Sequence, residues 1–199
     1  MNVKTELLRF TENSANLRFN DVNIEPETIQ AIMINEVVPT DSYDDFYGKL
    51  DSAYMSTTIP LFQKAGIEVN SIHDILNLGI YITNAVKTPK SEYAVSKESI
   101  EESLPALEHE LHLFPNLKVI ILMGDVAKKA FNIISKKASG KNAVPSISTY
   151  KLRNTEIFYK GIRIIPSYIM TGQNILIEKS KFEMASEDIA TMYKLIIPK

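Results

Sequence analysis

The sequence predicts an α/β fold in three layers, with helices on both faces of a central, mostly parallel, four-stranded sheet. One observation is that short apolar runs alternate with longer segments of helical periodicity, as in successive βαβ units. Another is that the runs are apolar at consecutive positions, which is typical of strands buried on both faces. The strand-length runs are 30–38, 80–86, 118–123 and 162–165.

The first two strands and the loops that leave them are expected to carry a ligand site. Residues 30–38 form a nearly continuous apolar run that Pro39 ends, and the polar, turn-rich loop 40–48 follows. A helix is expected over 50–65 and the second strand over 80–86, which stops shortly before a proline. Ligand sites gather at the carboxyl ends of parallel strands, so both following loops are candidates.

The middle of the chain contains the clearest strand, turn and helix. Residues 96–114 carry apolar residues at nearly helical spacing, although Pro105 predicts a kink or a break in this helix. The third strand is 118–123, and Gly124 and Asp125 lead from it into another helix. This order continues the alternation that a parallel sheet requires.

The last third of the chain is expected to contain a strand pair and a final helix. Residues 140–150 are expected to form a loop, and 156–159 and 162–165 a short hairpin or strand pair. Pro166 is expected to force a turn after it. Apolar residues three and four apart over 182–196 predict an amphipathic helix that covers the core.

Length and composition predict one packed domain over residues 1–199. Hydrophobic residues make up 45% of the chain and charged residues 23%, as in an ordinary globular protein. The absence of Cys excludes a disulfide framework, a thiolate zinc site, a Cys-ligated iron–sulfur cluster and a cysteine nucleophile. Because the sequence shows no signal peptide and no run long enough to span a membrane, we expect a cytoplasmic protein without a membrane partner.

The net charge of −2 conceals a basic block. Residues 1–117 contain 8 Lys and Arg against 18 Asp and Glu, whereas residues 118–181 contain 12 against 3. A surface that binds a polyanion needs such a block, because Lys and Arg make most phosphate contacts. A solvated basic surface is the alternative, since a block in sequence need not form one face of a fold.

Four segments, taken in order, resemble the uracil-DNA glycosylase superfamily. They are MINEVVP at 33–39, FYGK at 46–49, YITNAVKTP at 81–89 and LFPNLKVIILMGDVAKKAF at 113–131. In that superfamily a catalytic loop follows the first strand, an aromatic residue stacks on the base, and a second strand delivers an Asn within T-N-x-V-K. The resemblance extends over roughly residues 30–180. It implies a monomer that flips a deaminated base, with uracil the first candidate, out of DNA and hydrolyses its N-glycosidic bond without a cofactor or metal.

The resemblance assigns base recognition to Asn84 and Phe46, with Tyr47 beside them. The Asn84 carboxamide offers one donor and one acceptor to the Watson–Crick edge of uracil. Phe46 would replace the stacking that a flipped base loses. The alternatives are that Asn84 bonds the loop backbone and that the two aromatic residues anchor the loop in the core.

Glu36 occupies the place of the acidic residue in the superfamily's G-E-A-P-G loop, where a carboxylate would hold water near the sugar. Its negative charge would also favour the positive charge that develops on the sugar in the transition state. This chain has Asn35-Glu36-Val37-Val38-Pro39, so the Gly is replaced and the Pro is displaced by one residue. Asp41 is the second candidate catalytic carboxylate, with Asp44 and Asp45 nearby, and a solvated acidic loop is the alternative.

The last strand is followed by PSYIMTGQN at 166–174, where the superfamily commonly has His-Pro-Ser. The alignment places Ile169 at the His position, and Ile cannot donate a hydrogen bond to the departing base. Such a donor is typically worth about 10²–10³ in rate. Backbone N–H groups or the Gln173 side chain are candidate replacements, unless this segment merely starts the last helix. The residues expected to contact DNA are Ser167, Tyr168, Thr171, Gly172, Gln173 and Lys179.

Three functions are compatible with these residues. The first is a DNA glycosylase, and the second is a catalytically impaired nucleic-acid or base-binding module on the same fold. The third is a hydrolase that acts on a nucleoside-like small molecule, for which DNA binding would be weak and independent of salt. Fold analogy alone does not separate them.

Overall fold

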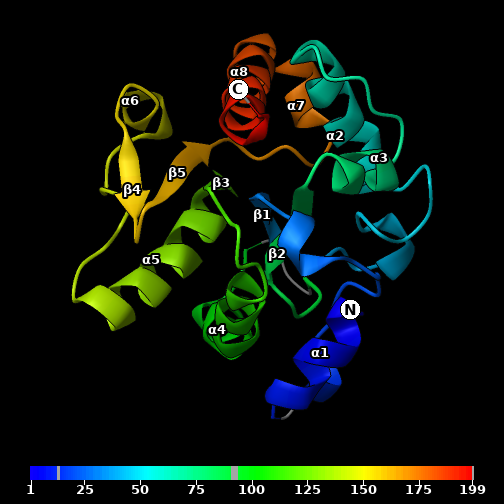
Figure 1. Ribbon diagram of the computed structural model, residues 1–199, viewed down its shortest axis with the longest axis vertical. Helices are drawn as coiled ribbons and strands as arrows, with labels where there is room; N and C mark the ends of the chain where they lie inside the picture. Colours follow the sequence, from blue (N-terminus) through cyan, green and yellow to red (C-terminus); the bar gives the residue numbers. More distant parts are fainter. Residues whose placement is uncertain (13, 91–93, 199) are drawn as a thin grey trace.

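A computed structural model of the chain describes residues 1–12, 14–90 and 94–198. A five-stranded sheet with the order β2-β1-β3-β5-β4 lies between two layers of helices (Figure 1). β2, β1, β3 and β5 are parallel to their neighbours, whereas β4 pairs antiparallel with β5 at one edge. The prediction of a three-layer, mostly parallel α/β fold is confirmed, and so is the strand pair at 156–159 and 162–165; the sheet has five strands rather than four because β4 of this pair joins its edge. The strands are β1 (Ala31–Val37), β2 (Ile80–Val86), β3 (Val119–Met123), β4 (Ile157–Tyr159) and β5 (Ile162–Ser167).

The two faces of the sheet bury separate apolar cores. One core packs against α1, α4 and α5, and the other packs against α2, α3 and α8 (Figure 1). Along β1, Ile32 and Ile34 join the first core and Ala31 and Met33 join the second, because successive strand side chains point to opposite faces. The helices are α1 (Val3–Phe10), α2 (Ala53–Lys64), α3 (Ile72–Asn77), α4 (Lys97–His112), α5 (Asp125–Ser139), α6 (Thr149–Leu152), α7 (Asn174–Ile177) and α8 (Lys179–Ile196), with 3₁₀ turns η1 (Ser14–Asn16), η2 (Pro26–Thr28) and η3 (Ser42–Asp44).

Two prolines lie inside elements, contrary to the prediction that they interrupt them. α4 continues through Pro105. Proline has no N–H, so the Glu101 carbonyl loses its helical partner, but both residues lie on the exposed face of the helix. β5 continues through Pro166, which pairs with Leu122 of β3. The pairing of β4 with β5 ends at Ile164. Pro166 therefore has no partner on the side of β4, and its missing N–H there breaks no hydrogen bond in the sheet.

Candidate functional site

A cleft of about 1590 Å³ lies where parallel strands end. Its lining includes Glu36 near the end of β1, Gly124 directly after β3 and Ser167 at the end of β5. The segments 142–150 and 167–178 also line it, together with one side of α5. The cleft therefore occupies the edge of the sheet at which ligand sites of open α/β folds lie.

Glu36 is held against the amino terminus of α5. Its Oε1 accepts the backbone N–H of Val126 at 3.0 Å, one of the first N–H groups of that helix. Gly124, the N-cap residue, has a φ of 98° and contributes no side-chain cap, so Glu36 supplies one from β1. Burial raises the pKa of Glu36, although the bond from Val126 acts in the opposite direction.

Gly124 is required for this arrangement. A Cβ atom at this position would collide with the Glu36 carboxylate, and it would lie 2.7 Å from Cγ1 of Ile169. The positive φ also favours glycine over other residues. The close approach of β1, the α5 terminus and the loop after β5 therefore depends on the absence of a side chain at Gly124.

Part of the basic block of the sequence lines the cleft. Among the described residues, five lysines line it alongside the acidic Glu36, Asp125 and Glu178. One of the five is nearly buried: Lys128 pairs with Asp125 at 2.7 Å and donates to the Thr149 hydroxyl at 2.5 Å. A cleft with this balance of charge suits a polyanion. The lysines are Lys128, Lys129, Lys136, Lys137 and Lys181.

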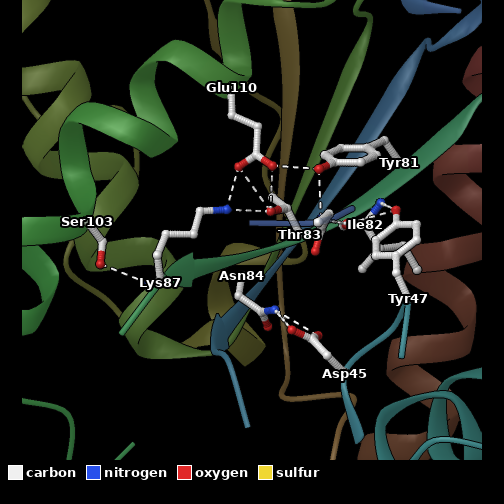
Figure 2. Close-up of polar contacts among 10 residues, drawn as sticks. Asp45, Tyr47, Tyr81, Ile82, Thr83, Asn84, Lys87, Ser103 and Glu110 are labelled. Carbon is white, nitrogen blue, oxygen red and sulfur yellow. Dashed lines mark hydrogen bonds and ion pairs between the residues drawn. The ribbon is translucent and has the colours of Figure 1, made fainter. Parts of the chain in front are cut away.

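Asn84 lies on β2, is 1% exposed and does not line the cleft. Its Oδ1 accepts a hydrogen bond of 2.7 Å from Nδ2 of Asn35. Its Nδ2 lies 2.9 and 3.1 Å from the two carboxylate oxygens of Asp45, toward which it points in Figure 2. Both polar atoms of the Asn84 side chain are thus engaged, and the partners are side chains rather than the loop backbone.

The other candidates in the loop after β1 anchor that loop. Phe46 is 1% exposed and packs on the Tyr54 ring at 5.1 Å between centroids. The Tyr47 hydroxyl donates to the Ile82 carbonyl at 3.0 Å (Figure 2). Asp41 is exposed and caps η3 through the Tyr43 N–H at 2.9 Å. The structure brings none of Asp41, Phe46 and Tyr47 to the cleft, and base stacking and catalysis by them stay predictions.

The loop after β5 does line the cleft. Ser167, Tyr168, Thr171, Gly172 and Gln173 contribute to its wall, and so does Ile169, which is 44% exposed. Ser167 is buried, and its hydroxyl donates to Asp188 of α8 at 2.6 Å. Lys179 is exposed at the start of α8 but does not line the cleft, whereas Lys181 does.

A buried ionic network joins β2 and the residue after it to α4. It was not predicted from the sequence. The Lys87 ammonium lies 2.5 Å from Oε2 of Glu110 (Figure 2). Oε1 of Glu110 accepts a hydrogen bond from the Tyr81 hydroxyl, and the Thr83 hydroxyl lies within hydrogen-bond distance of both carboxylate oxygens. The side chains of Lys87 and Glu110 are 2% and 0% exposed. The one signal in the sequence is that Glu110 falls on the apolar stripe of α4, in line with Leu107. The network fixes the end of β2 that carries Asn84.

The described parts of the chain show neither a metal site nor a membrane-crossing helix. No group of three or more His, Asp or Glu in them could hold a metal ion. His109 instead packs against the Phe10 ring in a tilted arrangement with ring centroids 4.1 Å apart, and His112 bonds the Glu108 carbonyl. No helix in these parts is long and apolar enough to cross a membrane.

Residues 45–185 match the family described as the Uracil DNA glycosylase superfamily. The matched span includes Asn84, the start of α5 and the loop after β5, and it begins after Glu36. No curated protein matches the chain. Because the match covers more than half of the residues, the chain belongs to the uracil-DNA glycosylase superfamily, whose members act on DNA.

Proposed function

We propose that the protein is a DNA glycosylase of base excision repair, which hydrolyses the N-glycosidic bond of a flipped deaminated base, with uracil the first candidate. The observation that carries the proposal is the position of Glu36, a carboxylate in a lysine-lined cleft at the carboxyl edge of the sheet. The lysines would bind phosphates on either side of the flipped nucleotide. We further propose that it acts as a cytoplasmic monomer without a cofactor.

Glu36 suits the charge that develops in this reaction. Departure of the base leaves positive charge on the sugar, and a nearby carboxylate stabilises that charge and orients the attacking water. The bond from the Val126 N–H keeps the Glu36 carboxylate in one orientation. For the base anion, Ile169 offers no donor, so the backbone N–H groups near Thr171 and the Gln173 carboxamide are the proposed replacements.

A catalytically impaired DNA-binding module is the second candidate. It is favoured by the engagement of both polar atoms of Asn84 and by the apolar Ile169 in the cleft wall. Such a module would keep the basic cleft and bind DNA without cleaving the bond.

One set of assays separates the candidates. Uracil excision is measured on labelled single- and double-stranded oligonucleotides with the wild type and Glu36→Gln, in which Gln can still accept the Val126 N–H. DNA binding is measured over a range of salt with Lys129→Ala and with Lys118→Ala, an exposed lysine outside the cleft.

Excision that depends on Glu36 supports the glycosylase. Binding without excision supports the module, and Lys129→Ala should then reduce the salt slope by about 1 while Lys118→Ala leaves it unchanged. DNA binding that is weak and independent of salt contradicts both candidates and favours a nucleoside-like small molecule as the substrate.

A further inference from the structure

Large apolar side chains are exposed inside the lysine-lined cleft. Ile147, Tyr150 and Ile169 line it and are 49%, 65% and 44% exposed. Apolar groups that are exposed together and bordered by charged residues are typical of a binding surface. The cleft therefore offers a ligand apolar surface as well as positive charge.

Tyr150 lies on a short helix that its neighbours hold in place. In α6, the Thr149 hydroxyl accepts a hydrogen bond from Lys128 of α5. Directly after α6, Arg153 donates to Asp188 of α8 at 3.1 Å. Among the residues that the structure describes, none bonds the Tyr150 side chain or packs a ring against it. A Tyr side chain has few rotatable bonds, so this ring offers a flat apolar face at a low cost in entropy.

One side of α5 carries lysines that are available for phosphates. The positions of α5 that line the cleft recur every three or four residues from 125 to 137, so they form one side of the helix over about 18 Å. One strand with the spacing of duplex DNA carries about five phosphates over that length. Lys129 and Lys136 form no ion pair with any described residue, whereas the other three lysines of the cleft do.

We infer that the cleft binds single-stranded DNA in preference to duplex DNA, and that an unpaired base stacks on Tyr150. The inference rests on the proposed function for DNA as the ligand and adds the form of the strand. Duplex DNA covers the faces of its bases, so it would use the lysines and leave the apolar side chains of the cleft in water. A single strand exposes base faces as well as phosphates, and it can contact both kinds of side chain at once.

The test measures the binding of a labelled oligonucleotide, alone and annealed to its complement, by fluorescence anisotropy over a range of salt. We expect the wild type to bind the single strand about tenfold more tightly than the duplex. Tyr150→Ala should weaken single-strand binding by about tenfold and leave duplex binding and the salt slope unchanged, because the lost contact carries no charge. Tyr150→Phe should bind like the wild type, since stacking needs the ring and not the hydroxyl.

Tyr43→Ala is the matched control. Tyr43 is 67% exposed, close to the 65% of Tyr150, but it does not line the cleft. Its replacement should leave both affinities unchanged. Because both side chains are exposed, neither substitution should lower the melting temperature, which thermal melts of the two variants check.

The inference is wrong if the wild type binds the duplex as tightly as the single strand, if Tyr150→Ala and Tyr43→Ala have equal effects, or if neither form of DNA binds. Uracil excision from both forms by the same proteins tests the proposed function separately. A single-strand preference that depends on Tyr150, without excision, supports the inference and contradicts the glycosylase. Excision with equal binding of the two forms does the opposite.

Discussion

Replacement of Lys87 by Met should destabilise the protein more than any exposed charge change. The Lys87 ammonium lies 2.5 Å from Glu110 and 2.6 Å from the Thr83 hydroxyl, in a region from which water is excluded. Met keeps most of the length of the side chain but carries no charge. The Glu110 carboxylate would then be stabilised only by the hydroxyls of Tyr81 and Thr83.

The expected cost follows from this burial. Removal of one partner of a buried ion pair typically costs about 3–5 kcal/mol, because the other charge is left uncompensated. A domain is stable by only about 5–15 kcal/mol, so the Lys87→Met variant should unfold at a much lower urea concentration than the wild type. Lys97→Met is the matched control, because the Lys97–Glu101 pair is exposed on both sides and its loss should cost less than about 1 kcal/mol.

Urea denaturation followed by far-ultraviolet circular dichroism measures the free energies of unfolding, and the absence of Trp makes this signal preferable to fluorescence. The double variant Lys87→Met/Glu110→Leu should recover most of the loss, since neither charge then remains buried. Equal losses from Lys87→Met and Lys97→Met, or additive losses in the double variant, would refute the reasoning.

Two further predictions concern Glu36. Gly124→Ala should cost about 1–3 kcal/mol and reduce excision, because the added Cβ displaces the carboxylate and Ile169 and strains a positive φ; wild-type stability and excision rate would contradict this. Burial raises the pKa of Glu36, so its contribution to stability is fully present below the ordinary value of 4.5 and is lost as the pH rises through the folded-state pKa. Glu36→Gln should therefore be more stable than the wild type at neutral pH and lose this advantage in acid. Thermal melts across pH measure this, and a variant that is less stable at neutral pH would contradict it.

The strands could be predicted because burial on two faces leaves a clear pattern. The run at 80–86 coincides with β2, since its apolar residues are consecutive and polar or proline residues bound it. The effect of Pro105 and Pro166 could not be predicted in the same way. Pro105 removes one helical hydrogen bond on the exposed face of α4, and Pro166 removes none because the pairing of β4 ends before it, and only the tertiary structure shows which side of each element is exposed or unpaired.

Site residues could be predicted from the sequence only where a single segment of the chain identifies them. The resemblance singles out Glu36, and the structure places this residue near the end of β1, where it lines the cleft. The partners of Asn84 could not be predicted, because both are distant in sequence: the strand register places Asn35, 49 residues away, opposite Asn84, and the loop after β1 brings in Asp45, 39 residues away. In sequence, Asp45 resembles its neighbours in a solvated acidic loop.

The two residues at the end of β1 point to opposite faces of the sheet. Asn35 follows Met33 on the face covered by α2 and α8, whereas Glu36 follows Ile34 on the face covered by α5. Asn35 accordingly bonds Asn84 and the loop after β5, and Glu36 bonds the start of α5. A one-residue shift in the register of β1 would exchange the faces of the two side chains, so the pairing of β1 with β2 and β3 determines that Glu36 reaches the start of α5 and Asn35 reaches Asn84.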